Sequence, residues 1–110
     1  MDQITVHHFN QWDDFEQKVL VEGALVFPEL EAVLRQYLLS QPREVMEFKE
    51  CIIKEEEGIR NVEVAFHDHR SDYYIRLWGQ KSMKDDAVLE MVVDAVDLRT
   101  KEEIYKRQLV

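Results

Sequence analysis

Two histidines, an aspartate and an arginine stand side by side at His67-Asp68-His69-Arg70, where they could bind a metal ion or move a proton. On an extended strand, His67 and His69 would point to the same face, close enough for both imidazoles to hold one ion. Zinc normally takes three or four nitrogen, sulfur or carboxylate ligands, so this pair alone is incomplete. We regard His67 and His69 as candidate metal ligands, and a solvated turn between two strands is the favoured alternative.

Further ligands for such an ion would come from other parts of the chain. Asp68 could join the two histidines if the chain turns at that point. The other two histidines, His7 and His8, could supply one ligand if the strand expected at 4–9 lay beside the strand expected at 61–67. The spacing of residues in the sequence does not show whether these two strands are neighbours.

The same histidines could act as a general base, with His67 or His69 paired to Asp68 or Asp72. Successive side chains of a strand face opposite ways, so adjacent residues seldom form such a pair. Nothing else in the chain indicates catalysis. The motif G-x-S-x-G is absent, and the three glycines are too far apart for a phosphate-binding loop. The sequence therefore favours a non-catalytic protein, without excluding an enzyme, and it indicates no cofactor.

The single cysteine, Cys51, lies in the apolar stretch ECII, where a small core residue is the usual role. It cannot form an internal disulfide, and no apolar run reaches the roughly 18 residues that a membrane-spanning helix needs. The first residues also lack the basic and apolar regions of a secretory signal. We expect a cytoplasmic protein that does not bind a membrane.

Tyr74, Arg76 and Trp78 alternate along a predicted strand and would share one face of a sheet. Tyrosine, arginine and tryptophan are the residue types enriched at protein interfaces. If no helix covers that face, the three side chains form a candidate anchor patch for a partner. Ordinary packing, with Trp78 buried and Arg76 extending past it, is the alternative.

The chain carries 14 basic and 23 acidic residues, a net charge of −9, and residues 1–57 alone account for −8. This negative field repels nucleic acid and attracts a basic protein. Two acidic runs could steer such a partner, and their candidate residues are Glu55, Glu56, Asp85 and Asp86. A merely solvated surface is the alternative for each run.

Periodicity predicts two helices in the first half of the chain. Asn10 is a candidate N-cap, and Trp12, Phe15 and Val19 fall on one helical face that should end near Gly23. A second helix should begin at Pro28 and end before Pro42. Its apolar residues follow helical spacing, namely Leu30, Val33, Leu34, Tyr37 and Leu38.

Strands are predicted at 4–9 and 45–54, followed by a hairpin of residues 61–67 and 73–78. A helix ending at Gly58 is the rival for the second of these strands. The last segment, 83–110, fits either strands or helices, because short apolar runs match both periods, and we favour strands.

These elements predict a single α+β domain over residues 1–110, in two layers. An N-terminal strand and two helices would pack on an antiparallel β-meander of about four to five strands. The leading functional hypothesis is a small acidic interaction module, such as an immunity- or antitoxin-type inhibitor of a basic protein such as a nuclease. The alternatives are a ligand-binding or catalytic domain that uses the His-x-His pair, and a subunit of a homo-oligomer.

Overall fold

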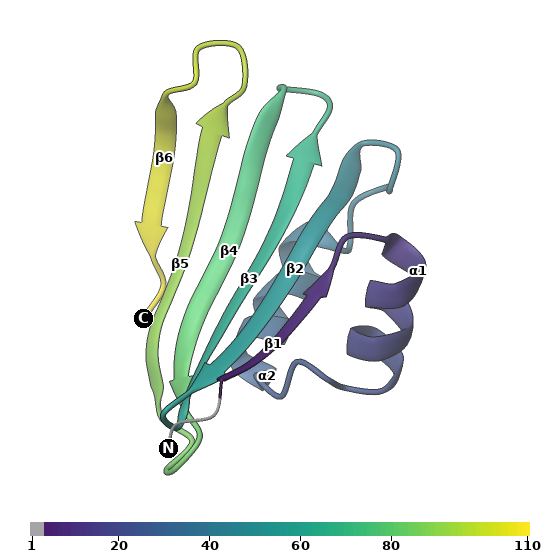
Figure 1. Ribbon diagram of the computed structural model, residues 1–110. Coiled ribbons are helices and arrows are strands. Elements are labelled where there is room, and N and C mark those ends of the chain that lie inside the picture. The colour runs from purple at the N-terminus through teal and green to yellow at the C-terminus, as the bar shows by residue number, and fades with distance from the viewer. Residues whose placement is uncertain (1–3) are drawn as a thin grey trace.

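The computed structural model describes residues 4–110, and the fold is α+β, as the sequence predicts. One antiparallel sheet contains six strands in the order β1-β2-β3-β4-β5-β6, with each strand beside its sequence neighbours (Figure 1). The strands are β1 (Ile4–Phe9), β2 (Met46–Glu56), β3 (Ile59–Asp68), β4 (Tyr73–Ser82), β5 (Val88–Asp97) and β6 (Glu103–Gln108).

The strand count corrects one part of the expectation. We expected a meander of four to five strands with the N-terminal strand packed on it, whereas β1 is itself the first strand of the sheet. It pairs with β2 in antiparallel register from Ile4 opposite Glu56 to Phe9 opposite Cys51. The helix alternative for residues 46–56 is wrong, because β2 hydrogen-bonds to strands on both sides.

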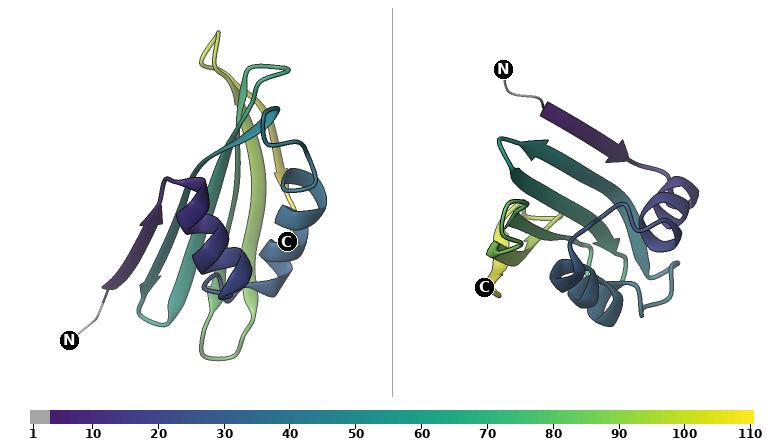
Figure 2. Two further views of the ribbon diagram at one scale, coloured as in Figure 1. Left: turned by 90° about the vertical axis from the view of Figure 1, so that its right-hand side faces the viewer. Right: turned by 90° about the horizontal axis from the view of Figure 1, so that it is seen from below.

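Both helices lie on the same face of the sheet (Figure 2). The first consists of α1 (Trp12–Phe15) and a π-helical continuation, η1 (Glu16–Val21). The second consists of α2 (Pro28–Val33), which begins at its proline as predicted, and a π-helical continuation, η2 (Leu34–Leu38). The N-cap of the first helix is Gln11 rather than Asn10, and its side chain makes no capping hydrogen bond.

The core lies between the helices and the sheet. Phe15, Val19, Leu30 and Leu34 are fully buried, as their helical spacing predicts, whereas Tyr37 is 60% exposed and lies outside the core. From the sheet, the fully buried side chains include Cys51, Val64, Phe66 and Leu77. Burial of these apolar groups is the main force that holds the two layers together.

Gly79 brings β4 close to α2. A Cβ atom at this position would lie 2.8 Å from the backbone oxygen of Glu90 and 3.0 Å from Leu30 Cδ1. Only glycine lets the helix and the neighbouring strand approach so closely.

The last third of the chain forms strands, which settles the ambiguity of residues 83–110. β5 pairs with β4 from Tyr73 opposite Asp97 to Lys81 opposite Val88, with a bulge beside Gln80. β6 then pairs with β5 and forms the second edge of the sheet. The helical alternative for this segment is therefore wrong.

Two turns at one end of the sheet are built in the same way. After β3, Asp68 Oδ1 accepts hydrogen bonds from the Arg70 backbone N–H at 2.9 Å and from Arg70 Nε at 3.3 Å. After β5, Asp97 Oδ1 accepts the same two bonds from Arg99, also at 2.9 and 3.3 Å. Each aspartate closes its turn by binding the backbone two residues further on.

Candidate functional site

The cluster His67-Asp68-His69-Arg70 divides into two parts with different roles. Asp68 and Arg70 close the turn after β3, while the rings of His67 and His69 lie together with their centroids 4.1 Å apart. Each imidazole also contacts a carboxylate. His67 Nε2 lies 2.7 Å from Asp72 Oδ1, and His69 Nε2 lies 2.7 Å from Glu47 Oε1.

The ligands that could complete a metal site differ from those predicted. Glu47, on β2 directly opposite His67, offers a carboxylate oxygen within 4.8 Å of one nitrogen of each histidine. The predicted contributors lie elsewhere. His8 instead contacts Glu50 at 2.9 Å, and Asp68 contacts Arg70.

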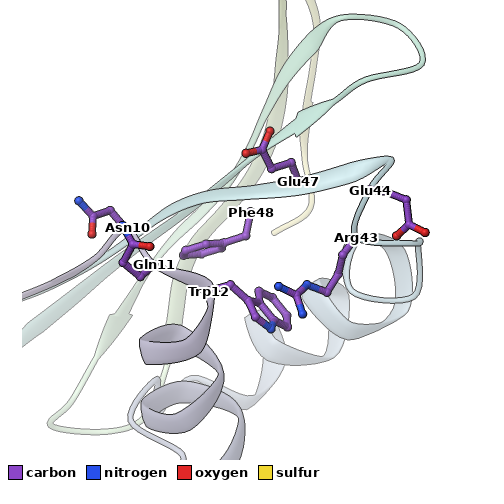
Figure 3. Close-up of a pocket in the computed structure, with 7 residues that line it drawn as sticks. All are labelled: Asn10, Gln11, Trp12, Arg43, Glu44, Glu47 and Phe48. Carbon is purple, nitrogen blue, oxygen red and sulfur yellow. The ribbon is translucent and has the colours of Figure 1, made fainter.

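The path of β2 explains why Glu47 reaches the histidines. Figure 3 shows Glu47 on one side of β2, and Phe48 on the other, facing Trp12. The register of β2 and β3 shifts between Phe48 and Glu50, which is a β-bulge. Because of this bulge, Glu47 and Glu50 lie on the same, helix-free face of the sheet.

Hydrogen bonding alters the acidity of Glu47. The hydrogen bond from His69 lowers the pKa of the Glu47 carboxyl below its usual value, and this effect outweighs the opposing effect of partial burial. A lowered pKa favours the ionised carboxylate, which suits Glu47 to contact a cation.

The predicted anchor residues lie on the helix-free face of the sheet. Residues of β4 alternate between the two faces, so Tyr74, Arg76 and Trp78 point away from the helices while Leu77 enters the core. All three side chains are partly exposed. An anchor patch requires that no helix cover the face that carries it, and the described structure meets this condition. The role of the three side chains in binding stays a prediction.

We call this surface the open face and define it by the outward-facing residues of the four central strands. From β2 to β5 they are Glu47, Glu50, Ile52, Lys54, Asn61, Glu63, Ala65, His67, Tyr74, Arg76, Trp78, Gln80, Glu90, Val92, Asp94 and Val96. Five carboxylates and two basic side chains give this set a net charge of −3, counting histidine as neutral. The open face is thus aromatic in its centre and acidic around it.

Arg76 is held in place by charged neighbours. Its Nε and Nη2 atoms donate to the two carboxylate oxygens of Asp94 at 2.9 and 2.7 Å, and Nη1 lies 3.5 Å from Glu63 Oε1. The Asp94 side chain is only 3% exposed, and that of Arg76 is 39% exposed. Such a bidentate pair fixes the orientation of the guanidinium plane.

The four candidate steering acids come together at the opposite end of the sheet from the histidines. The β2–β3 turn contacts the β4–β5 loop through a hydrogen bond from the Met83 N–H to the Gly58 oxygen, at 2.8 Å. Three of the acids have basic partners within 4 Å: Glu55 with Arg60, Glu56 with Lys54 and Asp86 with Lys81. Asp85 accepts a hydrogen bond from the backbone of Ala87. Local pairing reduces the field that these acids project.

Lys81 is a buried charge that the sequence did not indicate. Its side chain is 2% exposed, and its ammonium lies 3.2 Å from Asp86 and 3.5 Å from Glu29. It also lies over the ring of Phe27, 5.6 Å from the centroid. Through these two contacts, Lys81 joins Glu29 at the start of α2 to Asp86 in the β4–β5 loop.

A cleft of about 650 Å³ lies between the second helix and strands β4–β6. Its floor is apolar and includes Leu77, Met91 and Val93, while Tyr105 and Arg107 of β6 contribute a ring and a guanidinium. A second hollow, of about 540 Å³, lies between Trp12 and Arg43, whose guanidinium carbon is 4.3 Å above the indole ring (Figure 3). Neither was evident in the sequence, because each combines residues from distant segments.

Cys51 is buried, and its burial raises the pKa of the thiol to about 12. A thiol that stays protonated is a poor nucleophile, in keeping with the predicted core role. Among residues 4–110, no helix has the length and apolar content needed to cross a membrane. Comparisons with protein-family models, with curated proteins and with solved structures find no match to this chain.

Proposed function

We propose that this protein is an interaction module that binds a basic protein through the open face of its sheet, in the manner of an immunity- or antitoxin-type inhibitor. The observation that carries the proposal is the row Tyr74-Arg76-Trp78 on a face that no helix covers, surrounded by carboxylates. Aromatic side chains and arginine dominate the binding energy of many protein interfaces.

Preorganisation supports this use of the face. The sheet fixes the backbone of β4 on both sides, and the pair with Asp94 fixes Arg76, so binding would cost little side-chain entropy. The net charge of −3 on the open face, within a chain of −9, favours a cationic partner. The acids Glu55, Glu56, Asp85 and Asp86 would then act on the association rate from the end of the sheet.

The test is capture of partners with a tagged protein, followed by mass spectrometry, using two matched variants. In the open-face variant, Tyr74→Ser and Trp78→Ser remove the aromatic groups without changing charge. The control is Tyr37→Ser, which removes a tyrosine of the helical layer that is 60% exposed and so more exposed than Tyr74. A basic protein that binds the wild type and the control but not the open-face variant would support the proposal. Equal retention by all three proteins would contradict it.

Association kinetics with the captured protein then test the steering acids. Conversion of all four to Gln or Asn should slow association at low salt by about ten-fold and weaken its dependence on salt, since steering typically changes on-rates by 10- to 1000-fold. Neutralising Asp13, Asp14, Glu16 and Glu31 on the helical layer is the control and should have less effect. If both sets act equally, only the net charge matters.

A second candidate function rests on the cleft between the second helix and β4–β6. An apolar floor with Arg107 beside it suits an amphipathic anion. The fluorescent probe anilinonaphthalene sulfonate has this chemistry and should bind the folded protein. Arg107→Gln should weaken that binding, whereas Lys106→Gln, on the opposite face of the same strand, should not. Equal effects of the two substitutions would exclude the cleft.

A further inference from the structure

We infer that Glu47, His67 and His69 form a binding site for a divalent transition-metal ion, for which zinc is the natural probe. The three side chains offer one carboxylate oxygen and two imidazole nitrogens, all within 4.8 Å of one another. Ligand atoms bound to zinc at about 2.0–2.2 Å in a tetrahedron lie about 3.5 Å apart. Small side-chain rotations would therefore bring the three atoms to coordinating distance.

The ligand types decide the class of ion. Imidazole nitrogen suits zinc, copper, nickel and iron, whereas calcium and magnesium prefer oxygen ligands alone. Three protein ligands also leave a fourth position of a tetrahedral ion for water. The side chains of Glu47 and His69 are each 46% exposed and that of His67 is 20% exposed, so the ion can enter from solvent.

The backbone places these ligands before any ion binds. Glu47 and His67 are directly paired across β2 and β3, and the bulge after Phe48 turns Glu47 toward His67. The turn that carries His69 is fixed by the Asp68–Arg70 bonds and by a hydrogen bond from the His69 N–H to the Val45 oxygen, at 2.9 Å. A site fixed by strand pairing loses little entropy when it binds.

Asp72 has a separate, orienting role. Its carboxylate contacts His67 Nε2 at 2.7 Å, which is the arrangement in which an outer carboxylate orients a metal-binding histidine. Together with Glu47 it places two carboxylates beside the two imidazoles, and a divalent cation would offset their negative charge.

The sequence contains its own control for this site. His8 and Glu50 form another imidazole–carboxylate pair on the open face, with Nε2 and Oε2 2.9 Å apart, but without a second histidine in the cluster. If any surface imidazole–carboxylate pair could bind zinc, zinc would bind both at His8–Glu50 and at the cluster. Among residues 4–110, only the cluster of Glu47, His67 and His69 meets the requirement for three ligands.

The experiment is titration of the metal-free protein with zinc chloride by calorimetry at pH 7.5, repeated with cobalt(II) and followed by visible absorption. We expect one zinc ion per chain. We also expect a visible cobalt spectrum of low coordination number, and a higher melting temperature with zinc that chelator reverses. His67→Ala, His69→Ala and Glu47→Gln should each weaken binding by more than about ten-fold, and Asp72→Asn by about ten-fold. His8→Ala should leave it unchanged.

Melting curves of the metal-free variants show whether each one folds, and Glu47→Gln and Asp72→Asn keep the test valid if a histidine variant does not. Absence of saturable one-to-one binding by the wild type would overturn the inference. Equal loss of affinity in His8→Ala and His69→Ala would overturn it as well.

Discussion

The substitution Arg76→Met tests how firmly the central side chain of the open face is held. It removes the guanidinium but keeps a flexible apolar chain of similar length, so the main change is loss of the bonds to Asp94 at 2.9 and 2.7 Å. The Asp94 carboxylate, 3% exposed, would then remain buried without its partner. The expected result is a clear loss of stability.

The size of that loss follows from burial. Breaking a fully buried ion pair costs about 3–5 kcal/mol, and a hydrogen bond to a charged group contributes about 1.5–3 kcal/mol. Arg76 is 39% exposed, so solvent already screens part of the interaction, and we expect a loss of about 3 kcal/mol. For a chain of this length, that corresponds to a melting temperature lower by about 13 °C.

The assay is urea unfolding followed by circular dichroism, in a double-mutant cycle with Asp94→Asn. Once Asp94 is neutral, Arg76→Met should cost much less, and the coupling free energy should exceed about 1.5 kcal/mol. Arg76→Lys should show an intermediate loss, because an ammonium cannot make the two parallel bonds of a guanidinium. A loss below about 0.5 kcal/mol for Arg76→Met, or a coupling near zero, would refute the reasoning.

Three further predictions concern buried or turn-closing groups. Lys81→Met should keep the free energy of unfolding within about 1 kcal/mol of the wild-type value, because the carboxylate partners of Lys81 are exposed. Lys81→Ala should lower it by about 2 kcal/mol or more, because it leaves a cavity. Urea unfolding measures both changes. The hydrogen bond from Arg99 lowers the pKa of Asp97. The ionised carboxylate therefore stabilises the fold above about pH 4, and this contribution is lost as the pH falls through the lowered pKa. Acid unfolding of Asp97→Asn should lack this loss. Cys51, whose thiol pKa is about 12, should react with a thiol reagent at pH 8 only as fast as the protein opens, and urea should accelerate the reaction.

Local patterns in the sequence predicted most of the elements. The helical spacing of Phe15, Val19, Leu30 and Leu34 located both helices, since each side chain enters the core. Alternation located the strands and placed Tyr74, Arg76 and Trp78 on one face. Tyr37 fits the same helical spacing but is 60% exposed, and it lines the cleft between the second helix and β4–β6 instead of entering the core.

The candidate site was only half predictable, because it depends on which strands are neighbours. The spacing of His67 and His69 indicated a shared face, but their third ligand, Glu47, lies 20 residues before His67 and joins it only through strand register. The bulge beside Phe48 decides which face Glu47 occupies, and no residue type in the sequence indicates that a bulge forms there. One pattern in the sequence was informative and was missed. The triplets Asp68-His69-Arg70 and Asp97-Leu98-Arg99 share the spacing Asp-x-Arg, and both close a turn.

The order of strands in the sheet bears on how the chain reaches this structure. Each strand from β3 to β6 pairs with the strand made immediately before it, so these hairpins can form one after another as the polypeptide is synthesised. β1 is different, because both helices are inserted between it and its partner β2. It emerges from the ribosome before β2, yet it must wait for residues 51–56 before it can pair. Closing that long loop costs entropy, so we expect β1 to join late in folding, and until then β2 is the exposed edge of the growing sheet.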